Sequence, residues 1–308
     1  MESVPPEAEV FDLDPAAVLP HGSRVRCNPG FVLQEGRQQV RHGSGVIRPS
    51  DPDRRVSSAD GTPIAYWTIG RGPALLLVHG LGVDHDRWRP LAERLKDRYR
   101  VCLMDRRGRN GSGDRLPYAL EREVDDIRAV AEDAGPIVVL GHSLAGPIAM
   151  EAARRFPGII GVINYEGWPT NEGAVPSGLI DRLDALVAAG DYEGAYTLDD
   201  PPDIVEELRA DPMWPSRVAA AFTLPRELSA WERYWEGNPG YGDLAQPCLF
   251  LMGGENEPMY RAQARALMAG HPSATSAVIA GQGHQAHRHA PDLMAEVLLP
   301  FLQSMTSS

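Results

Sequence analysis

The stretch "VVLGHSLAGPIAM", residues 138 to 150, decides the fold, because an apolar strand pattern gives way to a helical pattern at a single serine. The β-branched run at 137–140 is bounded by glycine and proline, which predicts a short buried strand. Apolar residues then recur at helical spacing over 145–156, before a Pro-Gly helix stop. We therefore expect Ser143 on the turn between a strand and a helix.

The composition is that of an acidic globular protein. The chain has 308 residues, 43% of them hydrophobic, which is enough for one large domain with a substantial core. Its formal net charge of -12 disfavours nucleic acid or an anionic membrane as the main partner, because both attract a basic surface. No apolar run approaches the roughly 20 residues that a membrane span needs.

The cysteines and the first residues predict a cytoplasmic protein. Cys27, Cys102 and Cys248 are odd in number and widely spaced, and two of them lie in apolar runs. We therefore expect buried reduced thiols rather than disulfides or a zinc site. The chain opens with acidic residues and prolines, without the basic and apolar regions of a signal peptide.

Strand and helix patterns alternate along most of the chain. Residues 1–55 lack periodicity and predict an irregular surface arm, with a lid or an oligomer contact as the alternative. Residues 56–167 and 246–308 alternate apolar strands with helices, which is typical of a parallel sheet covered on both faces. Residues 168–245 predict a helical insertion. Strands are expected to begin at residues 62, 73, 99, 136, 159, 247 and 275, and helices are expected at 88–96, 120–134, 145–156 and 290–305.

Chemically reactive side chains follow several of these strands. Ligands of an open parallel sheet bind at the carboxyl ends of its strands. Ser143, Glu166, Glu257 and His284 stand at such ends, and His79 begins a His-Gly-Leu-Gly segment after another strand. A nucleophilic serine needs a base, an acid that orients the base, and N–H donors for the oxyanion. The sequence offers all of these groups.

The segment "GHSLAG", residues 141–146, resembles the nucleophile elbow of the α/β-hydrolase fold, whose pattern is Gly-x-Ser-x-Gly on a strand-to-helix turn. Ala145 replaces the second glycine, and a glycine follows it. The segment "LLLVHGLGVDHDRW", residues 75–88, resembles the oxyanion loop of the same family. The resemblance implies that Ser143 is the nucleophile and that the backbone N–H groups of Leu81 and Leu144 form the oxyanion hole.

His284, in "VIAGQGHQAHRHAPDL", resembles the catalytic histidine of this family, which follows the last strand. His287 and His289 lie close by and raise the alternative of a metal site. Carboxylate or cysteine ligands at matching spacing are missing, so we expect these two histidines to be solvated residues at a helix start. Neither a metal nor a cofactor is expected.

Phosphate binding is the rival interpretation of two glycine-containing segments. Gly80 and Gly82 have the first spacing of a dinucleotide fingerprint, but His85 stands where its third glycine would be. The segment "CLMDRRGRNGSGD", residues 102–114, lacks the Lys-Ser or Lys-Thr of a P-loop. Its glycines and arginines are therefore expected to form turns and structural contacts.

Two glutamates compete for the role of the acid. In the commoner arrangement of the family the acid follows the strand "PCLFLMGGENEP", which indicates Glu257. In other members, including haloalkane dehalogenases, it follows the preceding strand, and "GVINYEGWP" places Glu166 there. The chain is also similar to little-characterised bacterial hydrolases with Tyr-Glu after that strand. We favour Glu166 and keep Glu257 as the alternative.

The resemblance covers residues 56–308 and implies an α/β-hydrolase fold, with a mostly parallel sheet of about eight strands, flanking helices and a helical cap at 168–245. It implies a serine hydrolase that cleaves an ester, lactone or related carbonyl bond of a small, apolar molecule through an acyl-enzyme. Ser143 argues against relatives that use an aspartate nucleophile. Candidates for the substrate pocket are His79, Trp168, Trp214 and Trp231, with packing inside the cap as the alternative for the tryptophans.

Other functions of the same scaffold stay open. A perhydrolase or lyase without a cofactor would use the same triad. A receptor that binds a ligand on a hydrolase scaffold belongs to a different class, and it would show slow single turnover with persistent stabilisation by the ligand. The sequence does not predict an oligomeric state.

Overall fold

The computed structural model describes residues 51–167, 175–235, 241–257, 260–261, 264–265, 271 and 273–306. Most of the arm expected at 1–55 lies outside the described residues, as do Cys27 and Trp168. Cys102 and Cys248 are buried free thiols, as predicted. None of the helices in the described ranges is both long and apolar enough to cross a membrane.

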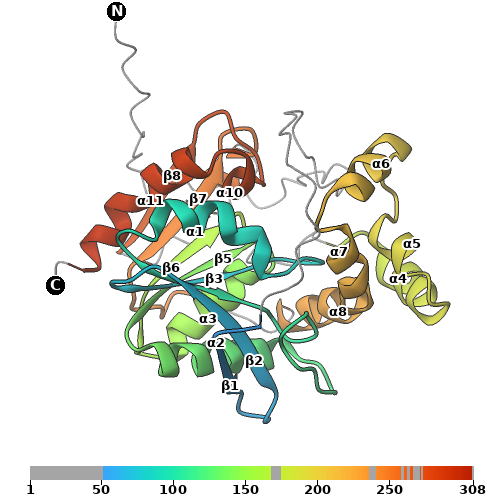
Figure 1. Cartoon of the computed structure of the whole chain (residues 1–308), viewed down its shortest axis with the longest axis horizontal. Helices are drawn as coiled ribbons and strands as arrows, with labels where there is room; N and C mark the ends of the chain where they lie inside the picture. Colours follow the sequence, from blue (N-terminus) through green and yellow to red (C-terminus); the bar gives the residue numbers. More distant parts are fainter. Residues whose placement is uncertain are drawn as a thin grey trace, which may run out of the picture.

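An eight-stranded sheet forms the centre of the described part of the chain (Figure 1). Its spatial order is β1-β2-β4-β3-β5-β6-β7-β8. Strands β3 to β8 are parallel, whereas β2 is antiparallel to both of its neighbours. The strands are β1 (Arg54–Ser57), β2 (Pro63–Ile69), β3 (Ala74–Val78), β4 (Arg100–Met104), β5 (Ile137–His142), β6 (Ile159–Tyr165), β7 (Cys248–Gly253) and β8 (Ala274–Ile279).

The mostly parallel α/β fold predicted from the sequence is therefore confirmed. The seven expected strands correspond to β2 through β8. The edge strand β1 was not predicted, because its sequence "RRVS" is short, polar and at the end of a segment without periodicity.

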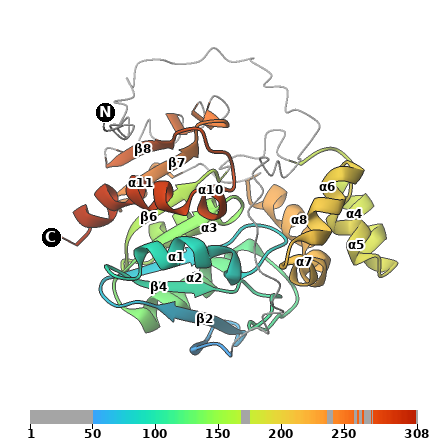
Figure 2. The ribbon, with the colours of Figure 1, turned by 45° about the horizontal axis from the view of Figure 1, so that its top comes forward.

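Helices cover both faces of the sheet (Figures 1 and 2). Side chains alternate between the two faces of a strand, so Leu76 packs in one hydrophobic cluster and its neighbours Leu75 and Leu77 pack in the other. The cluster of Leu76 includes α2 (Leu120–Ala134) and α3 (Ala145–Arg155), and the opposite cluster includes α1 (Arg89–Leu95) and α11 (Pro291–Ser304). Two short helices, η1 (His85–Trp88) and α10 (Ala286–His289), lie beside α1 and α11.

A group of helices lies between β6 and β7 in the chain and stands together beside the sheet (Figure 1). It has a small hydrophobic cluster of its own, which includes Leu183, Tyr196 and Leu208. The members are α4 (Leu179–Ala188), α5 (Tyr192–Tyr196), α6 (Pro202–Ala210), α7 (Trp214–Ala220), η2 (Ala221–Thr223) and α8 (Leu224–Trp235).

Buried ion pairs connect this helical group to the loop after β4. Arg106, in the loop after β4, is fully buried and pairs with Glu123 of α2 at 2.7 Å and with Glu227 of α8 at 2.9 Å. Arg109 of the same loop also pairs with Glu227. The structural role expected for the arginines of this segment is confirmed for Arg106 and Arg109.

Candidate active site

Ser143 occupies a tight turn between β5 and α3. Its φ of 55° lies in the left-handed region, which is strained for a residue with a side chain. A Cβ atom on Gly141 would collide with the Ala145 carbonyl, and one on Gly146 would collide with Asn164. The turn therefore requires glycine at both positions, whereas Ala145 fits without exposure to solvent.

Glu166 and His284 form a hydrogen-bonded pair beside this turn. His284 Nδ1 donates to Glu166 Oε2 at 2.6 Å. A carboxylate only accepts, so the proton is on Nδ1 and Nε2 is the basic nitrogen. Glu166 is 2% exposed, and its carboxylate also accepts hydrogen bonds from the N–H of Gly253 at 2.7 Å and from Asn256 Nδ2 at 3.1 Å. These donors hold the carboxylate in one orientation.

Glu257, the alternative acid, has a different partner. Its carboxylate pairs with Arg261, one helical turn further along the chain. His284 Nδ1 donates its hydrogen bond to Glu166 instead. The structure thus brings Glu166, and not Glu257, into contact with the imidazole.

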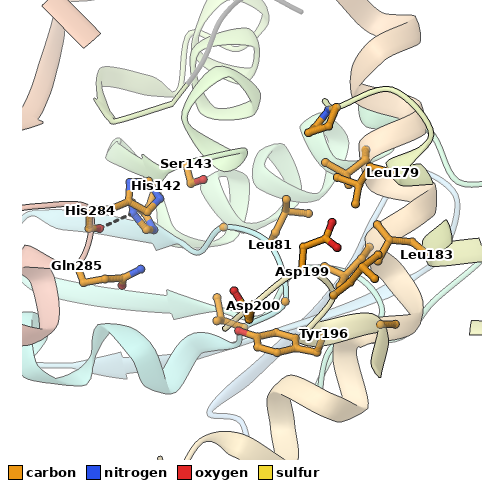
Figure 3. A pocket seen from close by; sticks show the side chains of 18 of the residues that line it. Leu81, His142, Ser143, Leu179, Leu183, Tyr196, Asp199, Asp200, His284 and Gln285 are labelled. Carbon is orange, nitrogen blue, oxygen red and sulfur yellow. Dashed lines mark hydrogen bonds between the residues drawn. The ribbon is translucent and has the colours of Figure 1, made fainter. Parts of the chain in front are cut away.

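Ser143 and His284 both line a cavity of about 180 Å³ (Figure 3). Ser143, His142 and His284 lie together at one end of it, and Leu179 and Leu183 lie at the other. The apolar wall comes from the loop after β3 and from the helical group, through Leu81, Val83, Pro176, Leu179, Leu183, Ala195, Tyr196, Leu198, Leu224 and Leu228. Polar side chains of the wall are Arg87, His142, Asp199, Asp200, His284 and Gln285. Ser143 and His284 therefore open onto a mainly apolar chamber whose wall also carries two carboxylates.

The loop after β3 passes close to the serine. A Cβ atom on Gly80 would lie 3.0 Å from the Cβ of Ser143, so a larger residue would push against the serine turn. Leu81 follows it and lines the cavity. Leu144, the other residue expected in the oxyanion hole, is buried at the start of α3.

The model of the Alpha/beta hydrolase family matches residues 75–297. The chain belongs to the alpha/beta hydrolase family. The hydrolase is 30% identical over 261 residues to the pimeloyl-[acyl-carrier protein] methyl ester esterase of Xanthomonas oryzae pv. oryzae (strain MAFF 311018), a match that covers 77% of this chain and 98% of that protein. The enzyme class predicted from the sequence is confirmed.

Two solved structures resemble the hydrolase. An alpha/beta hydrolase from Sphaerobacter thermophilus DSM 20745 has a TM-score of 0.71 and 34% identity, with 81% of this chain and 100% of that chain covered. An esterase from Thermogutta terrifontis shares the fold, with a TM-score of 0.61, 21% identity and coverage of 82% and 98%.

Several residues expected in the pocket of the hydrolase lie elsewhere. His79 is fully buried behind the cavity, where Nδ1 contacts the Gly80 carbonyl and Nε2 accepts from the N–H of Arg106. Trp214 packs edge-on against Tyr196 within the helical group, and Trp231 is buried in the cluster that includes α2 and α3. His79, Trp214 and Trp231 are therefore not among the residues that line this cavity, because they pack against other parts of the protein.

The expected solvation of His287 is also wrong. His287 is fully buried, and its Nε2 accepts a hydrogen bond from Arg87 Nε at 3.1 Å. Burial, followed by the neighbouring His142 and Arg87, lowers the pKa of His287 well below its usual value. His289 is half-buried. In the part of the chain that the structure describes, no three His, Cys, Asp or Glu side chains are grouped to hold a metal ion.

Five polar residues of the cavity wall were not predicted. They are Arg87, His142, Asp199, Asp200 and Gln285. His142 and Gln285 could have been found as chain neighbours of Ser143 and His284. No signal in the sequence distinguishes the other three, which come from η1 and from the segment after α5.

Proposed function

We propose that the hydrolase cleaves a carboxylic ester of a small, apolar molecule through an acyl-enzyme on Ser143, with His284 as base and Glu166 as the acid that orients it. The observation that carries this proposal is the 2.6 Å hydrogen bond from His284 Nδ1 to Glu166, beside a serine that lines the same cavity. A serine, a histidine and an acid so arranged supply nucleophile, base and orienting group.

The chemical steps follow from these roles. Ser143 Oγ attacks the carbonyl carbon while His284 Nε2 takes its proton, and the backbone N–H groups of Leu81 and Leu144 stabilise the oxyanion. His284 then gives the proton to the leaving alcohol, and an ester of Ser143 remains. Water attacks this ester with His284 again as base, which releases the acid and restores the serine. The steps need no cofactor.

The apolar part of the cavity wall indicates where the acyl group of the substrate would bind. Leu179 and Leu183 lie at the end of the cavity away from Ser143 (Figure 3), and Leu224 and Leu228 of the helical group line the same cavity. We infer that residues 168–245 act as a cap and that the acyl group lies against these leucines, where burial of each methylene is worth about 0.8 kcal/mol. The similar esterase is named for a pimeloyl-[acyl-carrier protein] methyl ester, so methyl esters of acyl chains are the first natural substrates to test.

The test is steady-state hydrolysis of a panel of small esters and lactones. The panel comprises p-nitrophenyl esters from acetate to dodecanoate, the matching methyl esters, and lactones of similar length. We expect steady turnover of esters that is lost in Ser143→Ala. Turnover that survives in Ser143→Ala would refute the acyl-enzyme. Single turnover followed by persistent stabilisation would support a receptor, and peracid formation faster than ester hydrolysis would support a perhydrolase.

A further inference from the structure

Two side chains hold the loop that carries His284. His142 Nε2 donates to the carbonyl oxygen of His284 at 2.9 Å (dashed line in Figure 3). The hydroxyl of Tyr165 donates to the carbonyl of Gly283 at 2.8 Å and accepts from the N–H of Ala286 at 3.1 Å. The backbone is therefore fixed at His284 itself and on both sides of it.

These two side chains come from the positions that precede the other members of the proposed triad. His142 directly precedes Ser143 at the end of β5, and Tyr165 directly precedes Glu166 at the end of β6. His142 and Tyr165 are also register partners in the parallel pairing of β5 with β6, and their ring centroids lie 4.8 Å apart. The nucleophile, the acid and both holding side chains thus belong to one rigid pair of strands.

His284 needs such support more than the other two residues do. Ser143 and Glu166 follow strands directly, in left-handed conformations with φ of 55° and 47°. His284 lies on the loop between β8 and α10, after Gly281 and Gly283, and glycine gives a backbone wide freedom. A displacement of about 1 Å in a catalytic group costs about 100-fold in rate. Hydrogen bonds to the loop backbone prevent such a displacement.

Both donors keep their protons at neutral pH. A carbonyl oxygen only accepts, so His142 carries its proton on Nε2. Burial, followed by His284 and Arg87, lowers the pKa of His142 well below its usual value, so the ring stays neutral. Burial and then the Glu166 carboxylate raise the pKa of Tyr165 well above its usual value, so the phenol stays protonated.

We propose that His142 and Tyr165 are positioning residues, which hold the backbone of residues 283–286 so that His284 stays between Glu166 and Ser143. This inference rests on the proposed function, because it assigns a role relative to the same triad. Neither residue takes part in bond making. The two residues affect the position of the base, so their substitution should lower kcat and leave KM nearly unchanged.

The test uses Tyr165→Phe, which removes only the hydroxyl, and Tyr99→Phe as the matched control. Both tyrosines are buried in the same hydrophobic cluster, but the catalytic loop contacts Tyr165. For Tyr165→Phe we expect kcat to fall about tenfold with KM within about twofold, since the variant loses both hydrogen bonds of the hydroxyl to the loop, and tenfold in rate corresponds to about 1.4 kcal/mol. The rate at which a fluorophosphonate modifies Ser143 should fall by the same factor. Tyr99→Phe should change neither quantity.

His142 offers a rescue experiment. Gln places an amide N–H near the position of Nε2, whereas Leu offers no donor, so His142→Gln should retain several-fold more kcat than His142→Leu. Equal kcat in these two variants, or a native kcat in Tyr165→Phe, would overturn the inference. Equal losses in Tyr165→Phe and Tyr99→Phe would also overturn it. A native protein that neither turns over esters nor reacts with the probe would instead overturn the proposed function, and the inference with it.

Discussion

The Glu166 carboxylate accepts a 2.6 Å hydrogen bond from His284 Nδ1, although the two residues are 118 positions apart in the chain. The contact joins the end of β6 to the loop after β8, across the intervening strand β7. β7 takes part as well, because the N–H of Gly253 at its end donates to the same carboxylate. The hydrogen bond between Glu166 and His284 therefore depends on how the ends of β6, β7 and β8 are placed in the sheet.

Glu166→Gln should lower kcat by at least about 100-fold, because an amide cannot stabilise the imidazolium that forms on His284. Folding should persist, since the Gln oxygen still accepts from Gly253. Steady-state kinetics with a p-nitrophenyl ester measure the effect. Glu257→Gln is the matched control and should stay within about threefold of native, since Glu257 pairs with Arg261. The reverse order of the two variants would assign the acid to Glu257.

Glu227→Gln should destabilise the fold by about 3 kcal/mol, because it leaves the buried guanidinium groups of Arg106 and Arg109 without this carboxylate. Urea unfolding measures the change, with Glu206→Gln on the exposed side of α6 as the control. Burial acts to raise the pKa of Glu227, but Arg106 and Arg109 lower it to about 2. The folded pKa is depressed, so this stabilisation is present above about pH 4.5 and is lost as the pH falls through about 2. A constant difference between native and Glu227→Gln over that range would contradict the assignment.

Buried histidines should make the fold less stable in mild acid. Burial is the first cause that lowers the pKa values of His79, His142 and His287 well below 6.5. Below about pH 6.5 the unfolded chain therefore binds more protons than the folded protein does. For each extra proton bound, the free energy of unfolding falls by about 1.4 kcal/mol when the pH falls by one unit. Two buried carboxyl groups offset part of this loss of stability. Burial raises the pKa of Asp84, and it raises the pKa of Asp126 to about 6. A net loss of about 1 kcal/mol or more per pH unit should appear in urea unfolding between pH 6.5 and 5. A flat profile would mean that the three histidines are protonated in the folded state.

Asp200 should favour substrates that carry a positive charge on the acyl group. It lines the cavity, and burial followed by Asp199 raises its pKa, so a cation would relieve an unfavourable carboxylate. The test compares the p-nitrophenyl ester of 4-(trimethylammonio)butanoate with its neutral tert-butyl isostere. Asp200→Asn should lower kcat/KM about fivefold for the ammonium ester alone. Asp203→Asn is the control, since Asp203 is exposed and does not line the cavity. An equal effect on both esters would exclude a contact with the cation.

Local patterns predicted the parts of the fold that local interactions determine. Helix α2 begins at Leu120 and ends at Ala134, as the apolar spacing indicated. The turn at Ser143 was predictable because glycines flank the serine where the strand pattern changes to a helical pattern. The choice between Glu166 and Glu257 was not, because both follow strands that are neighbours in the sheet, and only the fold shows which carboxylate faces His284.

The pocket was predicted poorly for a physical reason. Helical spacing shows that one face of a helix is buried, but it does not show whether that face meets the core or a cavity. Trp214 and Trp231 pack against other side chains, and the cavity is lined by leucines and by Tyr196. An aliphatic residue that lines a pocket cannot be distinguished in the sequence from one that is buried in the core.

The most direct test of the account is intact-mass spectrometry after treatment with a fluorophosphonate, followed by peptide mapping, with Ser143→Ala as the control. We expect a single adduct that maps to Ser143 and is absent from the control, because only a serine with a base beside it reacts in this way. Folded native protein that gains no adduct, or an adduct that persists in Ser143→Ala, would contradict the claim that Ser143 is an activated nucleophile.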